Sequence, residues 1–212
     1  MVRSNKQCRA ASNPMLKALL SALLVAMAMS TSTVAGSNVA RADDELQSLT
    51  KSARAAAKSL VSDLKKELKT ALKDGGPVHA IGVCKITAPA IAATTSEDSS
   101  LQVNRTALRV RNPGNAPDTF ERQVMENFLA EAKGGTELGT LEHAEIIKTD
   151  DGNRTFRYMK PIPMAAKPCL ACHGSNLKPD VTQAIKKAYP EDQATGFKPG
   201  ELRGAFTISK PL

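Results

Sequence analysis

Apolar residues recur every three or four positions from Asp44 to Lys73, and charged residues occupy the other faces. This spacing predicts an amphipathic helix, because it places the apolar side chains along one stripe. The stripe consists of Leu46, Leu49, Ala53, Ala56, Leu60, Leu64, Leu68 and Leu72. We expect the helix to end at Gly75, Gly76 and Pro77. The stripe is expected to pack in the core, and a homodimer seam is the alternative use.

A second apolar segment follows from Val78 to Thr94, with few charges and many Ala and Ile residues. It predicts a buried helix with a bend at Pro89, because proline removes a helical hydrogen bond. The pattern then favours a strand over Leu101–Arg111 and a loop over Asn112–Pro117, which contains two prolines and a glycine.

The second half of the chain carries a helix start signal and alternating segments. Asp118 followed three residues later by Glu121 predicts a capping box, and the helix should end near Lys133 before two glycines. An Asp-Gly pair at Asp151 and Gly152 favours a tight hairpin. The remaining predicted elements are strands Leu141–Thr149 and Asn153–Pro161, helix Pro179–Ala188 and strand Leu202–Ser209. Together they predict an α+β fold with antiparallel strands gathered in the C-terminal half.

The N-terminus has the layout of a secretory signal. Basic residues precede an uncharged apolar stretch, Ala18 to Met29. Ala40 and Ala42 are small residues at the two positions that a signal peptidase recognises before its cleavage site. Cleavage is expected between Ala42 and Asp43. A membrane-spanning helix would need about 20 apolar residues, which this stretch does not reach, so stable membrane insertion is not expected. The prediction is a signal peptide over residues 1–42, a single domain over 43–212, and a periplasmic location.

The charge balance depends on this segment. The chain has 29 Lys and Arg residues against 21 Asp and Glu, a net charge of +8. Cleavage removes five basic residues and no acidic one, which leaves 24 against 21 and a charge of +3. The basic excess therefore belongs largely to targeting, and no nucleic-acid partner is expected.

Three cysteines, Cys84, Cys169 and Cys172, remain after cleavage has removed Cys8. An odd number of thiols in an oxidising compartment calls for a role other than a disulfide framework. Cys169, Cys172 and the adjacent His173 form a Cys-x-x-Cys-His motif. Thiols three positions apart on one helical turn point the same way, which suits thioether bonds to the two vinyl groups of a heme.

The histidine of this motif is then tethered beneath the iron as an axial ligand. The sequence thus predicts one covalent heme c held by Cys169 and Cys172, with His173 bound to the metal. Three alternatives remain open: a zinc site completed by Cys84, His79 or His143, a redox-active dithiol, and a local disulfide.

The second axial ligand is less determined by the residues alone. Cys84 shares a helical face with apolar neighbours, and the other candidates are His79, His143 and several methionines. These methionines include Met125, Met159 and Met164. A buried cysteine with no metal role is also common. Spacing therefore leaves Cys84, methionine and plain core packing open.

Five blocks of the sequence resemble the PAS-like c-type heme domain family: Ile81–Ala92, Arg109–Glu121, Pro168–Gly174, Tyr189–Pro190 and Gly200–Ile208. The resemblance implies a PAS-like antiparallel sheet with a long N-terminal helix and flanking helices. It further implies that a cysteine thiolate lies opposite the motif histidine, a role that falls on Cys84. For Arg111, fold maintenance and proximity to a heme propionate are both open.

These features predict a cytochrome of low potential that acts in redox or gas sensing, with a soluble electron carrier as the alternative. The sequence contains no recognisable distal base or arginine of a peroxidase, so an enzyme is not expected. It names no specific redox or signalling partner. A homodimer through the N-terminal helix is a further prediction.

Overall fold

The structure is a computed structural model that describes residues 34–149 and 151–212. Most of the predicted signal peptide, including Cys8, lies outside the described residues, and so does Asp150 in the predicted hairpin. The chain divides into two compact units, residues 1–44 and residues 45–212. The elements that position the candidate site belong to the second unit.

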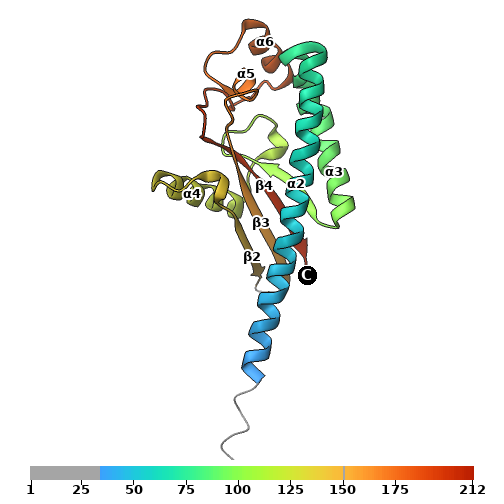
Figure 1. Cartoon of the computed structure of the whole chain (residues 1–212), viewed down its shortest axis with the longest axis vertical. Helices are drawn as coiled ribbons and strands as arrows, with labels where there is room; N and C mark the ends of the chain where they lie inside the picture. Colours follow the sequence, from blue (N-terminus) through green and yellow to red (C-terminus); the bar gives the residue numbers. More distant parts are fainter. Residues whose placement is uncertain (1–33, 150) are drawn as a thin grey trace, which may run out of the picture. The chain divides into compact units, whose positions relative to one another are not determined.

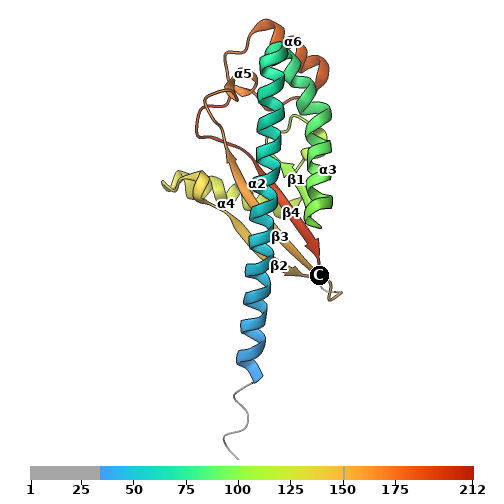
Figure 2. The same cartoon turned by 45° about the vertical axis from the view of Figure 1, so that its right-hand side comes forward.

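Four antiparallel strands form one sheet in the order β1-β4-β3-β2. These strands are β1 (Gln102–Thr106), β2 (His143–Lys148), β3 (Arg154–Pro163) and β4 (Leu202–Pro211). The last strand of the chain therefore lies inside the sheet, between the first strand and β3, as Figures 1 and 2 show. This arrangement brings residues near position 105 beside residues near position 205, with Arg105 opposite Phe206.

Helices cover both faces of the sheet (Figures 1 and 2). One face packs against α2 (Val34–Gly82) and α3 (Ala88–Ser99), and the other against α4 (Thr119–Lys133). The first core contains Ala53, Ala56, Ala57, Leu60, Ala92, Leu101, Val103, Phe156, Tyr158, Phe206 and Ile208. The second contains Val124, Met125, Phe128, Leu138, Met159 and Ala205. In β3 and β4, neighbouring side chains enter opposite cores, as the pleat requires.

Several predicted elements are confirmed, and with them the α+β class. Asp118 accepts a hydrogen bond from the Glu121 amide while the Glu121 side chain accepts one from the Asp118 amide, so the capping box forms. The predicted hairpin forms between β2 and β3, with Lys148 opposite Arg154. The short helix α6 spans Pro179–Ala188 as predicted.

The predicted strand over Leu101–Arg111 is wrong at its C-terminal end, because β1 stops at Thr106. The residues beyond it make contacts with the loop near position 193 instead of continuing the sheet. The carbonyl of Val110 accepts from the Gln193 amide, and Arg111 pairs with Asp192. Residues 107–111 therefore lie outside the sheet, although their local sequence pattern favours a strand.

The predicted helix break at Gly75 and Gly76 is present as a kink inside α2, where Gly76 adopts a φ of +70°. After Gly82 the backbone forms a π-helical turn, η1 (Val83–Thr87), before α3 begins. Pro89 lies in the first turn of α3, where its missing amide is tolerated. The prediction of a buried helix here is corrected: Ile86 is 73% exposed, so the segment is amphipathic.

The apolar stripe of α2 serves two purposes inside the fold. Ala53 and Leu60 are buried against the sheet, whereas Leu64, Leu68 and Leu72 line a cavity. By length and composition alone, the helical stretch Arg41–Ser99 contains a window that could cross a membrane. Within the fold, 28% of that window is buried.

Candidate functional site

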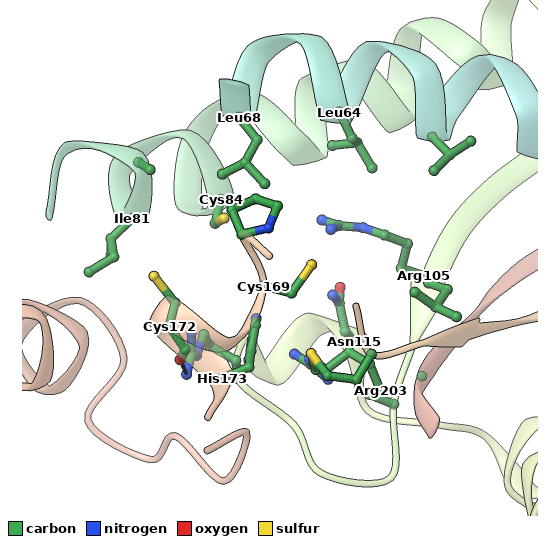
Figure 3. A pocket seen from close by; sticks show the side chains of 18 of the residues that line it. Leu64, Leu68, Ile81, Cys84, Arg105, Asn115, Cys169, Cys172, His173 and Arg203 are labelled. Carbon is green, nitrogen blue, oxygen red and sulfur yellow. Dashed lines mark hydrogen bonds between the residues drawn. The ribbon is translucent and has the colours of Figure 1, made fainter. Parts of the chain in front are cut away.

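A cavity lies between α2, η1, the short helix α5 (Leu170–His173) and the adjoining ends of β1 and β4 (Figure 3). Its walls are mainly apolar side chains, among them Leu64, Leu68 and Ile81. Most of the polar groups that reach it are cysteine, histidine and arginine side chains. Such a lining suits a large apolar ligand that carries a few specific polar contacts.

The four residues predicted from the sequence all line this cavity. Cys84 comes from η1, whereas Cys169, Cys172 and His173 come from α5 and its N-terminal cap. Figure 3 shows Cys84 on the helical wall beside Leu68, with His173 on the facing wall. The fold therefore brings together residues that are separated by more than eighty positions in the chain.

The competing ligand candidates lie elsewhere, with one exception. His79 is exposed, and His143 packs edge-on against Phe120 at the far side of the sheet. Met125 and Met159 are buried in the core beneath α4. Met164 does line the cavity and is almost fully buried, so it is the remaining alternative to Cys84.

His173 is held in one tautomer and one orientation. Its Nδ1 lies 2.7 Å from the carbonyl oxygen of Ala194, so this nitrogen must carry the proton and donate it. Burial, together with the positive charges of Arg203 and Arg111, lowers the pKa of His173 to about 3. The imidazole is therefore neutral at physiological pH and keeps the Nε2 lone pair for a ligand.

The backbone around α5 holds the motif rigidly. The His173 amide donates to the carbonyl of Cys169, and the His173 carbonyl accepts from the Phe197 amide at 2.9 Å. A Cβ on Gly174 would lie 2.7 Å from the Leu170 carbonyl oxygen, so only glycine fits there. The Phe197 ring also packs edge-on against the His173 ring. These contacts preorganise the Cys-x-x-Cys-His turn.

The cysteines are free thiols in a low-polarity setting. Burial raises the pKa of Cys84 and of Cys172, and nearby arginines oppose the shift. Within residues 34–149 and 151–212, no three His, Cys, Asp or Glu side chains are close enough to hold a metal ion on their own. The zinc alternative therefore has no support from the geometry, and Cys169 and Cys172 form no disulfide.

Arg111 has a structural role. Its guanidinium pairs with Asp192 at 2.9 Å and donates to the carbonyls of Cys172 and Ala194, and the Arg111 and Asp192 side chains are each 8% exposed. Burial acts to raise the pKa of Asp192, but hydrogen bonds from Arg111 and from the Ala194 amide outweigh it and lower the pKa. The pair thus ties α5 to the loop that orients His173.

Replacing Asp192 with alanine is expected to lower the free energy of unfolding by about 3 to 5 kcal/mol, because Arg111 would keep a buried, unpaired charge. Chemical denaturation monitored by circular dichroism measures this. Because the pKa of Asp192 is lowered on folding, its contribution should be complete above a pH of about 4 and decline as pH falls further. The matched control is Arg54→Ala, which breaks an exposed pair with Glu142 and should change stability far less. Equal effects of the two variants would contradict the assigned role.

Two residues that line the cavity were not predicted from the sequence. Arg105 on β1 and Arg203 on β4 both line the cavity, and Arg109 stacks on Phe197 with its guanidinium carbon 4.0 Å from the ring centroid. Arg105 follows Val103 on the same face of β1, so strand alternation alone would have directed it inward. Arg203 carried no such signal, since its orientation depends on an irregularity in the sheet.

The fold and the cavity define an α+β protein with an antiparallel sheet, in which helices enclose a cavity lined by thiols and one imidazole. A family model described as Tll0287-like: Tll0287 matches residues 24–211, and the chain belongs to this family. The family resemblance seen in the sequence motifs is thereby confirmed.

One solved structure is similar: the crystal structure of the cyanobacterial heme-protein Tll0287. The identity is 24%, the match covers 79% of this chain and 95% of that one, and the TM-score is 0.53. This likeness supports the shared fold. No curated protein matches the sequence.

Proposed function

We propose that this protein binds one heme, which Cys169 and Cys172 would hold covalently and whose iron His173 and Cys84 would bind, and that it acts in redox or gas sensing. The observation that carries the proposal is the convergence of these four side chains on one apolar cavity. The membership in a family whose solved relative is called a heme-protein supports it. Bound there, the heme would supply a redox-active iron whose potential depends on its axial ligands.

Each residue has a distinct task in this proposal. Cys169 and Cys172 anchor the ligand through thioether bonds, and His173 presents Nε2 because Ala194 occupies Nδ1. Cys84 offers a thiolate from the facing wall. Leu64 and the other apolar residues of α2 exclude water from the site.

The proposed compartment follows from the N-terminal sequence. We propose export by residues 1–42 with cleavage before Asp43, which leaves a single domain over residues 43–212 in the periplasm. Maturation outside the cytoplasm agrees with the presence of two free thiols that would be consumed in heme attachment.

A thiolate donates charge to iron and favours the oxidised state. We therefore expect a reduction potential well below those of His/Met cytochromes, measured by potentiometric titration of the purified holoprotein. The control is Cys84→Met, which recreates a His/Met pair in the same cavity and should raise the potential. A parent potential already in the His/Met range would contradict thiolate ligation.

Sensing is proposed because Cys84 lies in a π-helical turn, a local irregularity that is frequent at functional sites. The turn would let Cys84 leave the iron when the heme is reduced, and the site could then hold a small gas molecule. Carbon monoxide binding to the ferrous but not the ferric protein is the expected result. Ferrous protein with unchanged coordination that ignores carbon monoxide, together with rapid electron exchange with small periplasmic donors, would favour the electron carrier.

A further inference from the structure

The arginine side chains that line the cavity outnumber the carboxylates that pair with them. Arg105, Arg111 and Arg203 line it, and no Asp or Glu side chain within the described residues does. Asp192 neutralises Arg111 through the buried ion pair described above. Among the described residues, no carboxylate forms an ion pair with Arg105 or Arg203. Two half-buried guanidinium groups therefore face an apolar cavity without a counterion.

Such an arrangement is costly unless a ligand supplies the missing charge, because a desolvated ion needs a partner. Burial lowers the pKa of Arg105, and burial with the neighbouring arginines lowers the pKa of Arg203 to about 10. Both groups still carry their charge at neutral pH. Their mutual repulsion is a further sign that an anion belongs between or beside them.

An irregularity in the backbone of β4 sets the position of Arg203. In the β3–β4 ladder, Ile162 pairs with Gly204 and Pro163 with Leu202, so Arg203 has no partner and is the extra residue of a bulge. Bulges reorient a side chain and are frequent beside active sites. A Cβ on Gly204 would lie 2.3 Å from the Thr106 carbonyl oxygen, so only glycine allows β4 to approach β1 this closely.

We infer that Arg105 and Arg203 form a carboxylate clamp that binds the two propionates of the heme, an inference that rests on the proposed function. Figure 3 shows both arginines at the sheet side of the cavity, away from Cys172 and Ile81. A flat apolar ligand with its carboxylates at one edge would satisfy the leucine-lined wall and both guanidinium groups together. Arginine is the side chain best suited to carboxylates, since its planar fork matches their geometry.

The test first compares the holoprotein with the single variants Arg105→Gln and Arg203→Gln and with the control Arg122→Gln, whose side chain is exposed on α4. Resonance Raman spectroscopy reports the propionate bending band, which shifts when a carboxylate loses a hydrogen bond. We expect a shift in both cavity variants and none in the control. In Arg105→Lys and Arg203→Lys, the propionate bending band should lie between its positions in the parent and in the Gln variants. Bands identical to the parent in both Gln variants would overturn the clamp.

A second arm separates the clamp from the proposed function. The chain without residues 1–42, produced where thioether bonds do not form, is titrated with hemin and with hemin dimethyl ester, and circular dichroism verifies folding. We expect the ester to bind at least about tenfold more weakly, and each Gln variant to lose about tenfold in hemin affinity. Equal binding of hemin and ester would overturn the clamp alone.

Failure to bind either compound, with colourless holoprotein, would overturn the proposed function as well. Succinate at millimolar concentration provides the last comparison. Stabilisation by succinate in the parent and not in the Gln variants, with no preference of the protein for hemin over its ester, would mean that the arginines bind a free dicarboxylate.

Discussion

Replacing Cys84 with serine is expected to change the iron coordination and to raise the reduction potential by more than about 100 mV, because axial ligands set heme potentials over a wide range. The serine hydroxyl is nearly the same size as the thiol, so the fold of η1 should be unaffected. Electron paramagnetic resonance of the ferric protein measures the loss of the thiolate signal, and potentiometry measures the shift.

The matched control is Met164→Leu, because Met164 is the other sulfur-bearing side chain that lines the cavity besides the motif cysteines. This variant keeps the volume and removes the sulfur, so the parent spectrum should persist. A spectrum unchanged by Cys84→Ser but altered by Met164→Leu would assign the ligand to methionine and remove the basis for a low potential.

The second large effect is expected for His173→Ala. Loss of Nε2 should convert the ferric iron from low spin to high spin and reduce the yield of holoprotein. Added imidazole should restore the low-spin absorption spectrum, because the substitution leaves space where the ring stood. The control is His79→Ala, whose side chain is exposed and outside the cavity.

Low-spin iron in His173→Ala without added imidazole would show that another residue is the ligand. The expectation depends on the contact that fixes the parent ring, the 2.7 Å hydrogen bond from Nδ1 to Ala194. Only Nε2 remains to bind a metal in that orientation.

The sequence predicted the ends of helices correctly where neighbouring residues set them. The capping box of Asp118 and Glu121 starts α4, and the glycines at 75 and 76 interrupt α2. The strand predicted from Leu101 runs too far, because Arg111 lies outside the sheet and pairs with Asp192, eighty-one positions away. An ion-pair partner so far away in the sequence cannot be predicted from the pattern of neighbouring residues.

The residues of the candidate site also differ in whether local sequence could predict them. The motif Cys169 to His173 is contiguous, so its chemistry could be predicted from spacing, and Cys84 required the family resemblance to single it out from the other candidates. The orientation of Arg203 depends on a bulge opposite Pro163 and on the tight packing of Gly204. The π-helical form of η1 was likewise not predicted by the apolar pattern.

The central claim is that Cys169 and Cys172 bind a heme covalently, and intact-protein mass spectrometry of the exported holoprotein tests it most directly. The account predicts a chain that begins at Asp43 and carries the added mass of one heme, retained after extraction with acidified acetone and located on the peptide that contains both cysteines. A chain with no added mass, or a pigment that passes into the acetone, would contradict it.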